Sequence, residues 1–183
     1  MVKYLYHASF SGNERSILTR GLLTGCDRIW EYASKDKECI YTEEDPVNAV
    51  LWMLKWYAYS ILGQSPYSRM SGKVRNGESI ENMIWAIPRV EEGITVFQIH
   101  GARKRKKRNS YVQDTLVVGD IHPSDITIAF RVEYDIIQEL MYEYLQYFLP
   151  PYMHEPGILG IYDNYDYIYE YTRNILEDYG IFG

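Results

Sequence analysis

The chain has 183 residues, of which 46% are hydrophobic and 24% are charged, and its net charge is −6. These proportions are typical of a globular protein with a full core, and the acidic balance argues against a protein that coats nucleic acid with its whole surface. No apolar run reaches the roughly 18–20 residues that a membrane span requires, and no secretory leader is recognisable at the N-terminus. We therefore expect a cytoplasmic protein that does not use a membrane.

The cysteines and histidines show no metal-ligand pattern. Cys26 and Cys39 are the two cysteines. Two thiols without ligand spacing are expected to stay reduced in a cytoplasm, and a single bridge between them is the alternative. His100, His122 and His154 are also not spaced as ligands. The sequence therefore predicts no metal site.

The first part of the chain is predicted to form a strand and a helix. Residues 3–8 alternate in the manner of a strand. The Ser11-x-x-Glu14 spacing fits a capping box at the start of a helix, and Gly21 supplies a helix stop. A polar loop is predicted over residues 24–38.

A second strand and a long helix follow. The strand is predicted over residues 39–42, and Asp45-Pro46 then opens a helix with a cap residue followed by proline at the first position. The apolar stripe of this helix continues to about residue 62.

The middle of the chain is predicted to be a loop followed by strands. Residues 64–81 are rich in Gly, Ser and Asn and are interpreted as a long loop. The predicted strands are 83–87, 95–100, 115–118 and 126–132.

The pattern becomes helical from residue 134. A first helix is predicted to end at Pro150, and a second covers residues 162–179. The order of elements predicts an α+β domain over residues 1–133. Residues 134–183 are predicted to form a helical C-terminal extension packed on the same domain.

Three segments carry polar residues next to predicted strands. They are Tyr6-His7-Ala8-Ser9, Ile40-Tyr41-Thr42 and the stretch 114–126, which begins with Asp114. In this order and spacing they resemble the ADP-ribosyltransferase superfamily, in particular the His-Tyr-Glu branch related to diphtheria toxin and the poly(ADP-ribose) polymerases. The resemblance covers residues 3–131 and implies a split β-sandwich of two small sheets with flanking helices.

The resemblance also implies a cofactor, a reaction and a set of catalytic residues. The cofactor is NAD, and the reaction transfers ADP-ribose to a protein or nucleic-acid acceptor with release of nicotinamide. His7 would bind the ribose, Tyr41 would stack on the nicotinamide, and Asp114 would supply a carboxylate that stabilises the oxocarbenium-like centre. The implied cofactor-binding residues are His7, Ala8, Ser9, Tyr41 and Thr42.

The sequence departs from the family pattern at two of these positions. Asp114 stands where the family has glutamate, so its oxygens would lie about 1–1.5 Å further back, and a misplacement of that size lowers rates on the order of 100-fold. Ala8 replaces the usual glycine after His7.

A basic run before the third segment is a candidate for binding the acceptor. It comprises Arg103, Lys104, Arg105, Lys106, Lys107 and Arg108, and Tyr111 follows it. Six adjacent cations suit a phosphate-bearing or acidic acceptor, and Tyr111 could stack on a base. The alternative interpretation is a solvated hairpin tip that shields a strand edge.

Other interpretations remain open at this point. Within the same fold, the chain could be a tRNA 2′-phosphotransferase, although its arginines outside the basic run are scattered. It could also be a non-catalytic relative that binds NAD, ADP-ribose or nucleic acid through residues 103–108. At the level of single residues, His7 could be a structural hydrogen-bonding group, Tyr41 an ordinary half-buried strand residue, and Trp52 and Trp56 core residues. The sequence does not indicate an oligomeric state.

Overall fold

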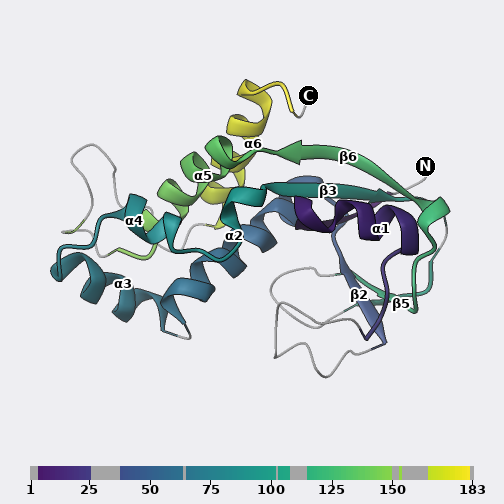
Figure 1. Ribbon diagram of the computed structural model, residues 1–183, viewed down its shortest axis with the longest axis horizontal. Coiled ribbons are helices and arrows are strands. Elements are labelled where there is room, and N and C mark those ends of the chain that lie inside the picture. Colours follow the sequence, from purple (N-terminus) through teal and green to yellow (C-terminus); the bar gives the residue numbers. More distant parts are fainter. Residues whose placement is uncertain are drawn as a thin grey trace. The chain divides into compact units, whose positions relative to one another are not determined.

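The computed structural model describes residues 4–25, 38–63, 65–101, 103–107, 115–149, 153 and 165–181. It is a mixed α+β structure with two small antiparallel sheets and several helices (Figure 1). The coarse fold class predicted from the sequence is therefore confirmed. None of the described helices is long and apolar enough to span a bilayer.

The chain divides into two compact units that do not follow the sequence order. The first unit comprises Met1–Trp52 and Ile94–Arg131, and the second comprises Met53–Gly93 and Val132–Gly183. The chain passes from the first unit to the second for the last time between Arg131 and Val132, close to the predicted boundary at residue 133. The C-terminal part is grouped with residues 53–93.

The first unit contains both sheets. One sheet has the order β1-β3-β6, formed by Leu5–Phe10, Ile94–Ile99 and Ile126–Val132. In its antiparallel β1–β3 register His7 lies opposite Phe97, and Ser9 lies opposite Thr95. Because side chains alternate along a strand, Leu5, His7 and Ser9 share one face of β1.

The second sheet is smaller and has the order β2-β5-β4. Its strands are Cys39–Thr42, Thr115–Val118 and Arg105–Lys107. The short strand β4 lies within the basic run, which the sequence predicted to be a connection between strands. β4 pairs with β5, with Lys106 opposite Leu116.

The core of the first unit joins the inner faces of both sheets. Its buried residues are Leu5, Ile17, Leu22, Ile40, Phe97, Ile99, Val117, Ile121 and Ile126. Burial of these aliphatic and aromatic side chains is the main stabilising contribution in this unit. It also fixes the strand ends that carry the candidate site.

The helix after β1 begins differently from the prediction. Residues Ser11–Asn13 form a 3-10 turn, and α1 covers Glu14–Arg20. The predicted capping box is wrong, because the Ser11 Oγ lies 2.9 Å from the Thr95 Oγ1 and the Glu14 carboxylate accepts hydrogen bonds from Thr95 and Arg131. Partners distant in the sequence therefore replace the local cap.

The second unit contains two helices where the sequence predicted a loop and a strand. Helix α3 covers Pro66–Arg75 inside the predicted loop, and α4 covers Ile80–Trp85 where a strand was predicted over 83–87. Helix α4 is capped by the Ser79 hydroxyl, which accepts from the Asn82 N–H at 3.2 Å. A short apolar run does not by itself distinguish a strand from a buried helix, and here packing decides.

The predicted long helix and the two C-terminal helices are confirmed. α2 covers Pro46–Leu62, α5 covers Tyr134–Gln146 and α6 covers Tyr165–Asp178. The buried residues of α6 are Ile168, Thr172 and Leu176, four residues apart, so they form one stripe of the helix.

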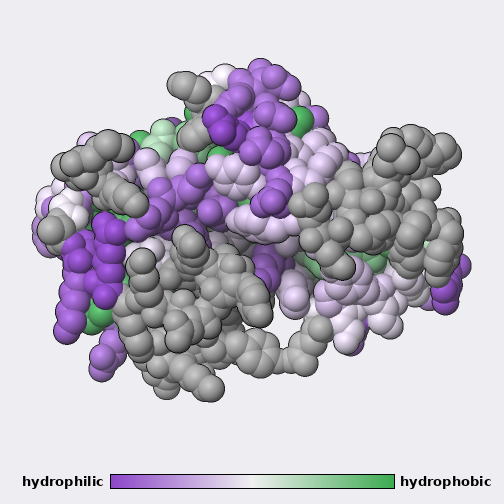
Figure 2. All heavy atoms as spheres, turned by 180° about the vertical axis from the view of Figure 1, so that it is seen from behind, coloured by the Kyte–Doolittle hydropathy of each residue, from purple (hydrophilic) through white to green (hydrophobic). Residues whose placement is uncertain are grey.

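On the face shown in Figure 2, hydrophobic residues appear as small separate areas among hydrophilic ones.

Candidate functional site

His7 and the backbone of Tyr41 meet where the two sheets adjoin. The His7 Nδ1 lies 2.8 Å from the Tyr41 carbonyl oxygen. A carbonyl can only accept, so Nδ1 carries the hydrogen and donates it. Burial lowers the pKa of His7, and this effect exceeds the opposing effect of the bond to Tyr41. The imidazole is therefore neutral near pH 7, with Nε2 left as a hydrogen-bond acceptor.

A backbone bridge holds these two residues in place. The Tyr6 N–H donates to the Glu43 carbonyl at 2.8 Å, and the Glu43 N–H donates to the Tyr6 carbonyl at 2.8 Å. The bridge fixes the end of β2 against β1, one residue from His7 and two from Tyr41. Two of the three predicted catalytic residues are thus brought together, whereas Asp114 lies outside the described residues.

The hydroxyl groups predicted to assist at the cofactor site bond within the fold. The buried Thr42 Oγ1 donates to the Thr115 carbonyl at 2.6 Å and so ties β2 to β5. The buried Ser9 Oγ accepts from the Asn13 Nδ2 at 3.0 Å. Ala8, between His7 and Ser9, is half-buried. Thr42 and Ser9 therefore have structural hydrogen bonds of their own.

The structure adds two residues that the sequence interpretation did not assign to the site. The Glu43 side chain is 4% exposed, and its Oε1 accepts from the Trp52 Nε1–H at 2.5 Å. Trp52 itself is half-buried and does not lie deep in the core. In the sequence, Glu43 belongs to the acidic stretch before α2, which is typical of a solvated turn, so no local signal indicates its burial.

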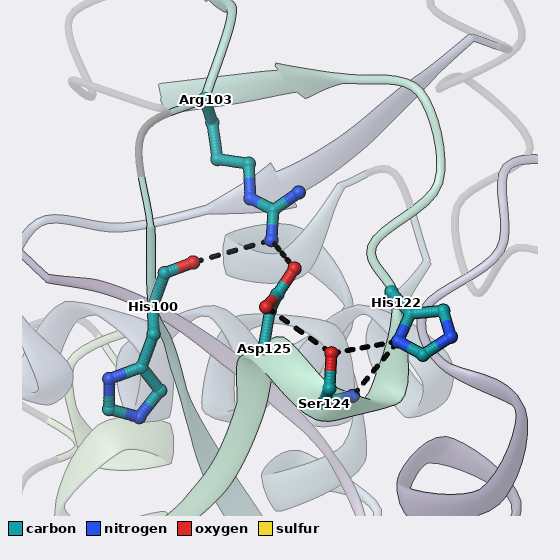
Figure 3. Close-up of polar contacts among 5 residues, drawn as sticks. All are labelled: His100, Arg103, His122, Ser124 and Asp125. Atoms are coloured by element: carbon teal, nitrogen blue, oxygen red, sulfur yellow. Dashed lines mark hydrogen bonds and ion pairs between the residues drawn. The ribbon is translucent and has the colours of Figure 1, made fainter.

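Arg103 of the basic run is bonded within the first unit. Its guanidinium forms an ion pair with Asp125 and donates to the His100 carbonyl at 3.3 Å (Figure 3). The hydrogen bond from Arg103 lowers the pKa of the Asp125 carboxyl. Figure 3 also shows Asp125 connected through the Ser124 hydroxyl to the His122 Nδ1, which lies 2.8 Å from the Ser124 Oγ.

The structure describes the basic run as far as residue 107. The Arg105 Nη1 lies 3.1 Å from the Glu44 Oε1, so a second arginine of the run is ion-paired within the unit. Lys104 is exposed. The backbone of residues 106–107 belongs to β4, while Arg108 and Tyr111 lie outside the described residues. Both interpretations of the run, an acceptor surface and a charged strand edge, therefore remain predictions.

Comparisons with protein-family models, with curated proteins and with solved structures find no match. A function for this chain is therefore inferred from its own residues and their geometry. Within the part of the chain that the structure describes, no group of three or more histidine, cysteine or carboxylate side chains could hold a metal ion.

The protonation of His7 predicts a pH dependence of stability. Its pKa is about 6.5 in an unfolded chain and lower in the folded protein. At pH values between these two pKa values, the unfolded state therefore binds more protons than the folded state. The stability that neutral His7 contributes is present above pH 6.5 and is lost as the pH falls through the folded pKa. Urea unfolding between pH 5 and pH 8 should show this loss, and the His7→Gln variant should not show it.

Proposed function

We propose that this protein is an NAD-dependent ADP-ribosyltransferase that modifies a protein or nucleic-acid acceptor and releases nicotinamide. The observation that carries the proposal is the bond from the His7 Nδ1–H to the Tyr41 carbonyl, which leaves a neutral imidazole with Nε2 as acceptor. The two small three-stranded sheets, joined next to this bond, agree with the split sandwich that the sequence resemblance implies.

The groups near this bond fit the chemistry of NAD. The Nε2 of His7 can accept a hydrogen bond from a ribose hydroxyl, and that bond is directional enough to orient the sugar. The rings of Tyr41 and Trp52 are half-buried aromatic surfaces on which a nicotinamide can stack. NAD supplies the glycosidic bond that breaks. Asp114 is the proposed carboxylate for the positive charge that develops on the ribose.

The proposed acceptor would approach through the basic run. Arg103 and Arg105 bond to Asp125 and Glu44, so these two arginines would mainly hold the run against the sheet. The exposed Lys104 is then a candidate for contact with phosphates or carboxylates of the acceptor. Incubation with labelled NAD and a cell lysate tests the acceptor class, because the label would be sensitive to nuclease for a nucleic acid and to protease for a protein.

The His7→Ala variant tests the activity itself. We expect it to bind NAD at least about 10-fold more weakly than the wild type, because the loss of a buried hydrogen bond of this kind costs on the order of 1.5 kcal/mol. Nicotinamide release, measured by chromatography, should fall by at least as much. Calorimetry with NAD gives the affinity, and the melting temperature shows whether the variant is folded.

The matched control is His122→Ala, which removes an exposed histidine that bonds to Ser124. This variant should bind NAD as the wild type does. Equal NAD affinity in the His7→Ala and His122→Ala variants, with both folded, would contradict the proposal. A wild-type protein that binds NAD but releases no nicotinamide would identify the non-catalytic relative instead.

A further inference from the structure

We propose that a surface of the second unit, around Trp85 and Tyr134, is a docking site for a lysine- and arginine-rich segment of a partner protein. The surface joins the end of α4, the start of α5 and the 3-10 turn Val90–Glu92. Both α4 and this turn pack on α5. We call it the Trp85 surface, and its members are Glu81, Trp85, Glu91, Tyr134 and Asp135. The inference goes beyond the proposed function and does not depend on it.

Trp85 is the most exposed large hydrophobic side chain among the described residues. It is 62% exposed, whereas the other exposed side chains of this kind range from 36% to 53%. Its ring packs on that of Tyr134, with the ring centroids 5.1 Å apart and the ring planes at 46°. Tryptophan is enriched among the residues that anchor protein interfaces, so an indole that is this exposed indicates a contact surface.

Three exposed carboxylates adjoin the two rings. Glu81 precedes Trp85 by four residues, which places both side chains on the same side of α4. Asp135 follows Tyr134 in the first turn of α5. Burial raises the pKa of Tyr134, and the negative charges of Asp135 and Glu91 raise it further, so both carboxylates lie close to this phenol.

The negative charge of the Trp85 surface is not compensated from within the described part of the chain. The ion pairs formed there involve none of its three carboxylates. Arg89, just before the 3-10 turn, donates to both carboxylate oxygens of Glu92, at 2.6 Å and 2.8 Å, so its charge is already paired. The surface is therefore complementary to a cationic partner.

Two unfavourable features coincide with this surface. Arg89 has a φ of +60°, and among the described residues it is the one non-glycine residue with a positive φ. The hydroxyl of Tyr134 is buried and has no hydrogen-bond partner in the part of the chain that the structure describes. Backbone strain and unsatisfied polar groups both lower stability, and strain of this kind is concentrated at functional sites.

An aromatic ring next to carboxylates favours a cationic side chain of a protein. The face of an indole attracts an ammonium or guanidinium group, and the carboxylates accept its hydrogen bonds. Because the carboxylates come from α4, the 3-10 turn and α5, they are arranged for several cations along one segment. The same negative charge repels the phosphates of a nucleic acid.

The test measures the binding of a fluorescently labelled hexalysine peptide by anisotropy. The affinity of the wild type should fall as the salt concentration rises from about 50 to about 200 mM. The Trp85→Ala variant should bind at least about 5-fold more weakly, and Trp85→Phe, which keeps a ring, should lose less. The Glu91→Gln/Asp135→Asn double variant should also bind at least about 5-fold more weakly.

Matched controls separate this surface from the general negative charge of the protein. Glu170→Gln removes an exposed carboxylate of α6, and Tyr4→Ala removes an exposed aromatic ring of the first unit. Both variants should bind the peptide within about 2-fold of the wild type. Melting temperatures show which variants are folded. If Trp85→Ala does not fold, Trp85→Phe and the double carboxylate variant provide the test.

The remaining outcomes distinguish other occupants of the surface. Equal peptide affinity in the wild type and a folded Trp85→Ala variant would overturn the inference, even if the double variant binds more weakly, because charge alone would then explain binding. Tetramethylammonium that binds as tightly as the peptide, with the same dependence on Trp85, would identify a small organic cation instead. Self-association of the wild type that Trp85→Ala abolishes, measured by sedimentation, would identify a second copy of the chain, and the partner-protein inference would be wrong.

Discussion

A Gly21→Ala variant is expected to lose at least about 3 kcal/mol of unfolding free energy. Gly21 ends α1 with a φ of +86° and a ψ of −174°, a conformation that is essentially restricted to glycine and costs another residue about 1–3 kcal/mol. In addition, a Cβ at this position would overlap the Ile121 carbonyl oxygen, which accepts the Leu22 N–H at 3.0 Å. The overlap is with backbone, so relief requires the bridge between Leu22 and Ile121 to shift. Urea unfolding measures the loss.

Gly25 provides a matched control for this substitution. Its φ is +83°, nearly the same as that of Gly21, but a Cβ there meets nothing within 4 Å. A Gly25→Ala variant should therefore lose only the cost of the positive φ, about 1–3 kcal/mol, and less than Gly21→Ala. If the two variants lose the same amount, the close approach of Gly21 to Ile121 does not contribute, and the prediction is wrong.

A Phe97→Ala variant is expected to lose about 3–5 kcal/mol of unfolding free energy. Phe97 is fully buried in the core between the two sheets and lies opposite His7 in the β1–β3 register. Removal of the ring loses its burial and leaves a cavity that the neighbouring strands fill only in part. Thermal and urea unfolding measure the loss of stability.

Phe130 on β6 is the comparison for Phe97. Its side chain is half-buried, so Phe130→Ala removes less buried apolar surface. This variant should lose clearly less unfolding free energy than Phe97→Ala. A Phe97→Leu variant, which keeps most of the apolar volume, should also lose less than Phe97→Ala. Similar losses in Phe97→Ala and Phe130→Ala would show that the core next to His7 is not tightly packed.

The candidate site could be predicted from sequence only where its residues belong to recognisable motifs. His7 and Tyr41 stand out because each lies on a short strand pattern followed by helix signals. Their meeting depends on the Tyr6–Glu43 bridge, which joins residues 37 positions apart and leaves no periodic trace in the sequence. Glu43 was missed for the same reason, since its burial comes from Trp52 and the bridge.

The basic run illustrates how tertiary contacts alter the meaning of a charge pattern. Six adjacent cations indicate a surface for anions when they are considered alone. In the folded unit, Arg103 pairs with Asp125 and Arg105 pairs with Glu44, so part of the positive charge is compensated by carboxylates from other segments. The acceptor surface would then depend on fewer residues than the sequence indicates.

Local chemistry by itself determined the coarse α+β class, the start of α2 at Pro46, the end of α1 at Gly21 and the two C-terminal helices. These features follow from caps, stops and hydrophobic period, which act between residues within one or two turns. The tertiary structure alone decided that residues 80–85 form a helix, that Glu43 is buried and that His7 is neutral with a fixed tautomer. Each of these depends on burial and on partners distant in the sequence, which no local pattern specifies.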